Sequence, residues 1–311
     1  MHSILKRLKQ TLFPIKGAFI VFFLYLVYRL PQGFTYRLGL FLGRLLYKFS
    51  SKRKKVVLTN LKIAFPQLNQ QEIDKLAYKS SQQSGILLME FPLAWFGQQA
   101  EIEQQILKVF NTALINEPLN NQQSVIVVMP HLGNWEILVQ WIQINFPMVG
   151  LYSPSKIPQM DKVLYSARSK FGGNPYPSNN KGILRLLRSL KQGGLMIILP
   201  DQVPKGDGGT YSPFFGQPAY TMTLLHKFIQ KTQSKVVFAC CIRSEEQRGF
   251  QINLEKPIFE IGEKDPMIFN AGLNHQLEQM IKKNPEQYVW DYKRYKRQQD
   301  GRDFYKRDFK N

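Results

Sequence analysis

A histidine followed five residues later by a carboxylate, His131 and Glu136, is the pair in this sequence best suited to acid–base chemistry. An imidazole titrates near neutral pH, so it can take a proton from a hydroxyl that is about to attack. A carboxylate bonded to the other ring nitrogen fixes the tautomer and stabilises the imidazolium that forms. Because no serine stands in a nucleophile elbow here, the attacking hydroxyl would come from a substrate. The spacing alone also suits a loop histidine and an acidic residue that merely favours a helix dipole.

The elements around this pair place it at the edge of a sheet. Residues 124–129 are a short β-branched apolar run, which predicts a buried parallel strand, and Pro130 ends it. Gly133 and Asn134 make a turn, and an apolar helix begins at Trp135 with Asn134 as its N-cap. Open α/β sheets carry ligands at the carboxyl ends of their strands. Free backbone N–H groups from Gly133 to Trp135 could there face a developing oxyanion.

Composition sets the class of partner. The chain has 311 residues, a net charge of +20 and a pI of about 9.8, which suits one large α/β domain or two small ones that meet an acidic partner. No zinc finger, RNA-binding signature or helix-turn-helix spacing points to nucleic acid. The only cysteines, Cys240 and Cys241, are adjacent in an apolar run. This excludes a disulfide framework and a zinc site, and it fits a reducing compartment.

The amino-terminal residues are basic and contain an apolar segment. Residues 1–71 hold thirteen Lys or Arg and no Asp or Glu, and residues 17–28 are uncharged. This segment is shorter than the roughly 20 residues of a straight span, and no small-residue cleavage site follows it. We predict an uncleaved membrane anchor over residues 1–32, spanning or half-inserted, with a buried core helix as the alternative. The basic cluster at 52–55 outweighs the one at 6–9, which favours a cytoplasmic body.

The rest of the chain, residues 33–311, is predicted to be an α/β domain with a mixed central sheet flanked by helices. Residues 34–49 predict an amphipathic helix, either at the interface of an anionic membrane or packed on the domain. The other predicted helices cover residues 72–91, 157–171, 180–191, 221–231 and 266–283, and the other predicted strands cover 147–152, 195–199, 236–242 and 249–254, the last two antiparallel at the sheet edge.

Three further features bear on the site. Asp201 and Gln202 stand at the root of a Gly/Pro-rich loop after a buried strand, where a site would be placed, although Asp201 could simply cap the turn. His226 lies among apolar neighbours, which favours a core or surface histidine over a second base. The basic-aromatic tail up to Asn311 is predicted to be a solvated or membrane-facing end.

Several blocks, in order, resemble one known family. The segment 131–136, His-Leu-Gly-Asn-Trp-Glu, resembles the HxxxxD/E motif of the lysophospholipid-acyltransferase-like superfamily. Asp-Gln at 201–202, Pro-Phe-Phe-Gly at 213–216 and Pro-Glu-Gln-Tyr-Val-Trp at 285–290 are similar to blocks of the bacterial lipid A biosynthesis acyltransferases, the late lauroyl and myristoyl transferases. At the place of the Asp-Gln and Pro-Phe-Phe-Gly blocks, glycerolipid acyltransferases carry a Pro-Glu-Gly-Thr-Arg-type sequence, and this chain has none. The resemblance covers nearly the whole chain.

The resemblance implies a glycerol-phosphate-acyltransferase-like fold and an enzyme on the cytoplasmic side of the bacterial inner membrane. Such an enzyme moves an acyl group from an acyl carrier protein thioester to a hydroxyl of a 3-hydroxyacyl chain on a Kdo-bearing lipid A precursor. It needs no metal or other cofactor. Its partners are the carrier protein, the lipid A precursor and the anionic inner membrane, with no nucleic acid. One alternative is acylation of another membrane lipid or glycolipid, such as a lysophospholipid, ornithine lipid or mannolipid. Another is a non-enzymatic basic protein that binds membrane or nucleic acid.

The resemblance also implies roles for individual residues. His131 would be the general base, and Glu136 would hold it. Arg168 and Lys170 match an Arg-x-Arg block, but a lysine offers a point charge instead of a bidentate fork, so Lys170 also suits an ordinary basic helix end. Tyr292 stands where the family commonly has a histidine. The residues expected to bind substrate are Gly133, Asn134, Arg168, Lys170, Asp201, Gln202 and Arg294.

Overall fold

The computed structural model describes residues 2–244, 249–302 and 304–306, with side chains from residue 16 onward. The basic cluster at 6–9 and the tail beyond residue 306 therefore lie outside the described side chains. The helices are α1 (His2–Arg29), α2 (Gln32–Phe49), α3 (Ser51–Ala64), α4 (Gln70–Phe96), α5 (Gln99–Gln105), α6 (Ala113–Asn120), α7 (Trp135–Asn145), α8 (Pro158–Ser169), α9 (Asn180–Lys191), α10 (Leu224–Thr232) and α11 (Pro266–Lys283). The strands are β1 (Ile106–Phe110), β2 (Val125–Val128), β3 (Met148–Tyr152), β4 (Asn174–Pro177), β5 (Leu195–Ile198), β6 (Gly209–Phe214), β7 (Gln217–Met222), β8 (Lys235–Ser244) and β9 (Gly249–Glu255).

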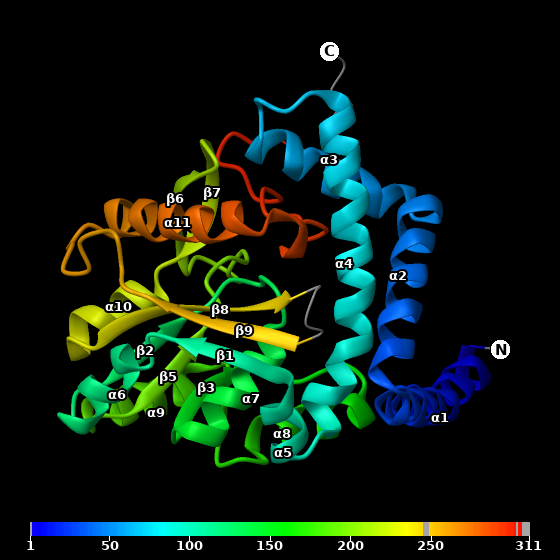
Figure 1. The fold of residues 1–311 in the computed structure, drawn as a ribbon, viewed down its shortest axis with the longest axis horizontal. Helices are drawn as coiled ribbons and strands as arrows, with labels where there is room; N and C mark the ends of the chain where they lie inside the picture. The colour runs from blue at the N-terminus through cyan, green and yellow to red at the C-terminus, as the bar shows by residue number, and fades with distance from the viewer. Residues whose placement is uncertain (1, 245–248, 303, 307–311) are drawn as a thin grey trace.

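The predicted mixed sheet flanked by helices is confirmed. A seven-stranded sheet has the order β1-β9-β8-β2-β5-β3-β4, and its central pairs are parallel (Figure 1). All four residues of β2 are buried because helices cover both faces, which is why this strand is a continuous apolar run. β8 and β9 are antiparallel as predicted, but they do not form the edge. The half-exposed strand β1, which lacks a continuous apolar pattern, takes that place.

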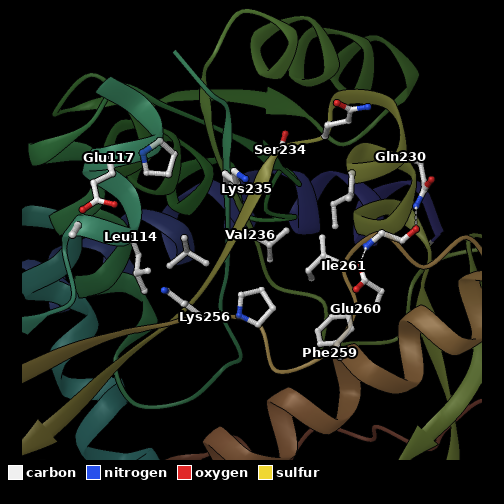
Figure 2. A pocket seen from close by; sticks show the side chains of 17 residues that line it. Leu114, Glu117, Gln230, Ser234, Lys235, Val236, Lys256, Phe259, Glu260 and Ile261 are labelled. Atoms are coloured by element: carbon white, nitrogen blue, oxygen red, sulfur yellow. Dashed lines mark hydrogen bonds between the residues drawn. The ribbon is translucent and has the colours of Figure 1, made fainter. Parts of the chain in front are cut away.

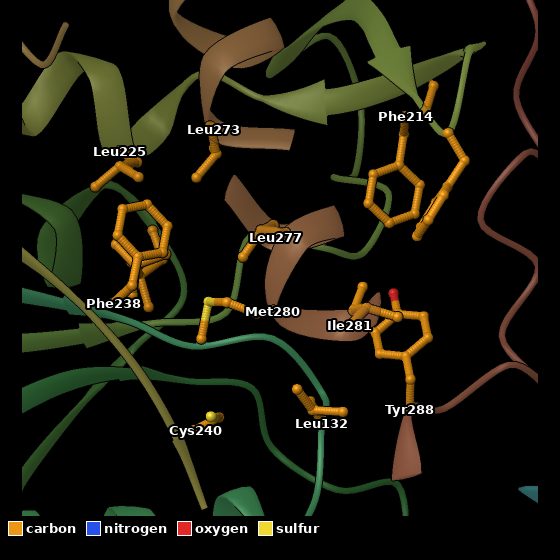
Figure 3. Close-up of a cluster of buried hydrophobic side chains, with 14 of the residues drawn as sticks. Leu132, Phe214, Leu225, Phe238, Cys240, Leu273, Leu277, Met280, Ile281 and Tyr288 are labelled. Atoms are coloured by element: carbon orange, nitrogen blue, oxygen red, sulfur yellow. The ribbon is translucent and has the colours of Figure 1, made fainter. Parts of the chain in front are cut away.

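The sheet separates two apolar layers. One lies between the sheet and α11, where Leu273, Leu277 and Met280 face Phe238 and Cys240 of β8 (Figure 3). The spacing of these three α11 residues puts them on one face of the helix. The second layer packs α7 and α6 beneath the same strands. The two layers fix the sheet from both sides and so hold the carboxyl end of β2 in place.

The two cysteines point to opposite faces of β8, because neighbouring side chains on a strand alternate. Cys240 belongs to the layer with α11 and Cys241 to the layer with α7. Burial raises the pKa of Cys240 to about 12 and that of Cys241 well above its ordinary value. We expect neither thiol of the folded protein to react with N-ethylmaleimide at pH 8, and both to react in guanidinium chloride, as counted by mass spectrometry. Rapid labelling of the folded protein would contradict this packing.

The predicted helix at residues 34–49 is confirmed as α2, and it packs along α4 (Figure 1). The contact is glycine on glycine: a Cβ on Gly85 of α4 would lie 2.2 Å from the carbonyl oxygen of Gly39. The other face of α2 leaves Phe34, Phe41 and Phe49 exposed. The predicted anchor is the helix α1, but no helix in the described part of the chain is both long and apolar enough to cross a bilayer.

The carboxyl-terminal residues are only partly solvated, as far as residue 306, with Lys296, Arg302 and Lys306 exposed. Tyr305 is buried, and its hydroxyl donates to Asn60 Oδ1 at 2.9 Å and accepts from the Tyr295 N–H at 3.0 Å. The aromatic side chains of this segment pack against the core that also includes α3. The basic residues of this segment are therefore exposed to solvent, as predicted, whereas its aromatic residues pack into the interior.

Candidate active site

The loop that carries His131 leaves the carboxyl end of β2 and is held by a segment from far along the chain. The carbonyl of His131 accepts from the Val289 N–H at 3.2 Å, and the Gly133 N–H donates to the Gln287 carbonyl at 3.0 Å. Leu132 and Tyr288 form an isolated antiparallel bridge between the same segments. The block at 285–290, noted for its family resemblance, therefore fixes the position of the histidine.

Asp201 is the carboxylate that contacts His131. Its two oxygens accept separate bonds, Oδ1 from the ring Nδ1 at 2.7 Å and Oδ2 from the backbone N–H at 2.9 Å. The Asp201 side chain is 1% exposed, whereas that of His131 is 19% exposed. Burial alone would raise the pKa of Asp201, but the imidazole, the backbone N–H of His131 and the charge of Arg294 lower it below its ordinary value. The carboxylate therefore stays ionised and holds the ring in one orientation.

The remaining ring nitrogen is ready to act as a base. Because Asp201 accepts the proton of Nδ1, the Nε2 atom carries the lone pair. The side-chain amide of Gln202 lies 3.3 Å from Nε2 and donates to it. Of the residues predicted to bind substrate, Asp201 and Gln202 are thus brought directly onto the histidine.

The expectation that Glu136 holds His131 is wrong. Asn134 caps α7 as predicted, with its side chain accepting from the Ile137 N–H at 3.0 Å, and this puts Glu136 in the first turn. From there the carboxylate pairs with the Arg168 guanidinium and accepts from Trp95 Nε1 at 3.2 Å. The first turn of the helix directs the side chain toward α8 and α4 and away from the ring.

The expectation that Gly133 and Asn134 offer free N–H groups is also wrong. The Gly133 N–H is taken by Gln287, and the Asn134 N–H donates to the Cys241 carbonyl at 2.8 Å. Gly133 has φ +62°, and a Cβ there would lie 2.0 Å from that same carbonyl oxygen. Glycine is required because the loop adopts a left-handed conformation and presses directly against β8. These two residues hold the loop on β8.

Lys170 and Arg294, both predicted to bind substrate, are turned inward. Lys170 Nζ donates to the Ala94 carbonyl at 2.9 Å and the Gly97 carbonyl at 2.7 Å, so it caps the carboxyl end of α4. Burial lowers the pKa of Lys170 to about 8, against the opposing effect of Glu101. Arg294 is 3% exposed and donates to the Tyr220 carbonyl at 2.7 Å.

An aromatic wall beside the histidine has no counterpart in the sequence predictions. The ring of Trp135 meets that of His131 edge-on at 4.9 Å between centroids. Phe91 packs against Trp135 at 5.4 Å and stacks on Trp95 at 5.2 Å. The signal was the four-residue spacing of Phe91 and Trp95, which puts both on one face of α4. The aromatic wall links His131 to the Glu136–Arg168 pair.

A buried ion pair behind the loop was also missed. Arg243 of β8 is 5% exposed and pairs with Glu90 of α4. Glu90 also accepts from the side-chain amide of Asn134 at 3.0 Å, and Gln287 bonds to both backbone groups of Arg243. An arginine inside an otherwise apolar strand was the available signal. The pair ties α4, β8 and the His131 loop together.

Two other features lie away from this site. A pocket of about 780 Å³ is lined by the first residues of β8, including Lys235 and Val236, and by Phe259 and Ile261 (Figure 2). It sits at the amino end of strands whose carboxyl ends carry the site, so it is on the opposite edge of the sheet. His226 bonds to the Glu263 carbonyl at 2.9 Å and packs at a tilt against the ring of Phe269, 5.0 Å between centroids, which confirms the prediction of a structural histidine.

The sequence that forms this site matches a known protein family. Residues 5–297 match the family described as bacterial lipid A biosynthesis acyltransferase. The chain belongs to this family. It is 26% identical over 279 residues to the lipid A biosynthesis lauroyltransferase of Escherichia coli K12, covering 89% of this chain and 90% of the relative. The myristoyltransferase of the same bacterium is 25% identical, over 85% and 80%, and its palmitoleoyltransferase is 23% identical, over 88% and 88%.

Membership makes the chain an acyltransferase of lipid A biosynthesis. The resemblance noted in the sequence blocks is therefore confirmed at the level of the family. The family's motif pairs a histidine with a carboxylate five residues on, and here that carboxylate contacts Arg168 while Asp201 contacts the ring.

Proposed function

We propose that this acyltransferase moves an acyl group from an acyl carrier protein thioester to a hydroxyl of a 3-hydroxyacyl chain on a Kdo-bearing lipid A precursor. The observation that carries the proposal is a histidine whose Nδ1 is bonded to a buried carboxylate, so that Nε2 keeps its lone pair and meets only the neutral amide of Gln202. This arrangement activates a hydroxyl, and within the described part of the chain the ring nitrogens are bonded to Asp201 and Gln202 and to no hydroxyl. The attacking hydroxyl then belongs to the acceptor.

The transfer runs in two proton movements. His131 Nε2 takes the proton of the acceptor hydroxyl, which displaces the Gln202 amide from that nitrogen. The oxygen attacks the thioester carbonyl, a carbon–oxygen bond forms, and the amide of Gln202 donates to the developing oxyanion. The carbon–sulfur bond then breaks, and the thiol leaves with the proton from His131. Asp201 stays ionised throughout and stabilises the imidazolium between the two movements.

The surroundings of the ring support acyl and anionic substrates. The aromatic wall of Phe91, Trp95 and Trp135 offers an apolar surface for an acyl chain next to the base. Arg168 is held at the far side of this wall by Glu136, with a quarter of its side chain exposed. A guanidinium so placed suits a phosphate of the acceptor or of the pantetheine arm. Both substrates of the proposed reaction combine these two chemistries.

We infer that α1 and α2 lie in the surface of the anionic inner membrane, with the body of the protein on the cytoplasmic side. Large apolar side chains on both helices are exposed, among them Phe19, Phe22, Phe41 and Phe49. A soluble surface rarely gathers so many, and such patches mark membrane or protein contacts. The exposed cations Arg29, Arg37, Arg44 and Lys48 lie on the same two helices and favour anionic lipid.

The proposal is tested by offering purified Kdo-bearing lipid A precursor and a set of acyl carrier protein thioesters to membranes with wild-type or His131→Ala protein. We expect product with wild type and a loss of about 10²–10⁴-fold in the variant, because the base is removed. The thioester that reacts best would show the length of the acyl chain that the enzyme transfers. Equal product in both, with the variant folded, would contradict the role of His131. No product from any donor would contradict the proposed substrates while leaving the family unchanged.

A further inference from the structure

One long stretch of the domain carries only positive charge. Residues 162–200 contain seven Lys or Arg and no Asp or Glu. Arg168 and Lys170 are engaged at the site and at the end of α4. Four of the others lie on α9, so this helix concentrates the unexplained charge.

The charges of α9 form a stripe on its outer face. Asn179 caps the helix, with its side chain accepting from the Gly182 N–H at 3.0 Å. Leu186 and Leu190 are buried against the sheet and fix which face points outward. The spacing of three or four residues puts the cations along the opposite face. The exposed residues of this stripe are Lys181, Arg185, Arg188 and Lys191.

The stripe is not neutralised by the protein itself. Among the residues that the structure describes, none of these four cations forms an ion pair within 4 Å of an acidic group, and the Arg185 guanidinium lies 5.5 Å from the ring of Tyr176. Like charges at this spacing destabilise a helix by a few tenths of a kcal/mol per pair. An acidic partner would remove that repulsion.

The stripe begins at the edge of the sheet that carries the site. β4 and β2 run in the same direction through the chain of parallel pairs β4-β3-β5-β2. The first turn of α9 follows the carboxyl end of β4, just as His131 follows the carboxyl end of β2. α9 packs over β3, two strands from β2, which is about 10 Å to the side at the spacing of neighbouring strands. A flexible thioester arm can bridge this separation.

We propose that the basic stripe of α9 is the docking surface for the acidic acyl carrier protein that delivers the thioester. This docking proposal rests on the proposed function, and it adds the place where the acyl donor binds. A bilayer is the poorer occupant, because an in-plane membrane helix needs an outward apolar face. On α9 Leu186 and Leu190 are buried, and Leu184 is the one large apolar side chain that stands exposed among the four cations. Most of the exposed aromatic residues lie instead on α1 and α2, on the other side of the molecule (Figure 1).

The test is charge reversal on α9 in the full-length protein. The double variant Arg185→Glu, Arg188→Glu is compared with Lys75→Glu, Lys79→Glu, which reverses the same number of exposed charges four residues apart on α4. Two readouts are used: binding of fluorescently labelled bacterial holo-acyl carrier protein, and transfer of one acyl group from the carrier protein or from coenzyme A.

We expect the α9 variant to bind the carrier protein more weakly and to show a KM for the carrier thioester that is higher by about tenfold or more. The reason is that two positive charges complementary to the acidic carrier are lost from the interface. Its kcat and its KM for acyl-coenzyme A should stay unchanged, and the α4 variant should stay within about twofold of wild type throughout. Equal carrier binding in wild type and α9 variant would overturn the proposal, as would equal losses in both variants, which would report only net charge.

Two further outcomes separate the docking surface from its alternatives. Loss of binding to anionic vesicles by the α9 variant, with carrier binding intact, would assign the stripe to the membrane and overturn the proposal. Carrier binding that depends on α9, without transfer to any lipid A precursor, would keep the docking surface and refute the proposed function instead.

Discussion

Asp201→Asn is expected to lower kcat by about 10³–10⁴-fold while the protein stays folded. The two oxygens of Asp201 accept two different donors of His131, the ring Nδ1–H and the backbone N–H. An asparagine has only one acceptor oxygen. If that oxygen keeps the backbone bond, the amide NH₂ faces Nδ1 and moves the ring proton to Nε2, where a base needs its lone pair. The assay is single-turnover acyl transfer, with circular dichroism to confirm folding.

The control for Asp201→Asn is Glu136→Gln. It also removes one negative charge, but from a carboxylate that does not contact the ring of His131. Its carboxylate holds Arg168 and Trp95, so the tautomer of His131 is untouched. We expect a loss of about tenfold, mainly as a raised KM, since a positioned guanidinium binds substrate anions. A loss in kcat as large as that of Asp201→Asn would return the role of ring partner to Glu136.

Arg243→Met is expected to reduce the free energy of unfolding by about 3–5 kcal/mol, the largest stability effect we predict. The methionine keeps the apolar stem but leaves the Glu90 carboxylate, whose side chain is 17% exposed, without its cation. Burial of an unpaired charge costs far more than the pair contributes. The measurement is guanidinium or thermal unfolding, with activity followed in parallel, because Glu90 also holds Asn134 in the His131 loop.

Two controls show whether the unpaired charge of Glu90 causes the loss of stability. Lys283→Met breaks the exposed pair with Glu255, whose side chains are 58% and 25% exposed, and should cost at most about 1 kcal/mol. Adding Glu90→Gln to Arg243→Met removes the unpaired charge and should restore a substantial part of the stability. A double variant no better than Arg243→Met would mean that the other lost contacts of the guanidinium, among them its bond to Gln83, are responsible.

Local signals in the sequence were enough for the central strands and for the longer helices of the domain. The helix predicted at residues 180–191, which two glycines at 193–194 follow, is α9, and the apolar run before Pro130 is β2. Asn134 caps α7 because the side chain bonds within its own turn, an interaction complete within three residues. The apolar central strands and amphipathic helices also gave the mixed α/β class. The hairpin β6–β7 and the edge strands β1 and β4 were missed, because none of them carries a continuous apolar run. The helices α3, α5 and α6 were also not predicted.

The sequence by itself determined that His131 stands at a strand end next to a helix start, with Asp201 at the end of another strand. Only the tertiary structure decided which carboxylate meets the ring. β5 lies beside β2 and runs parallel to it, so residues seventy positions apart become neighbours, whereas Glu136 is turned toward α8 by its helix. Strand order and helix packing likewise determine that Lys170 bonds to the end of α4 and that Arg294 bonds to β7. Partner choice between charged groups depends on these nonlocal contacts, and a linear spacing does not contain them.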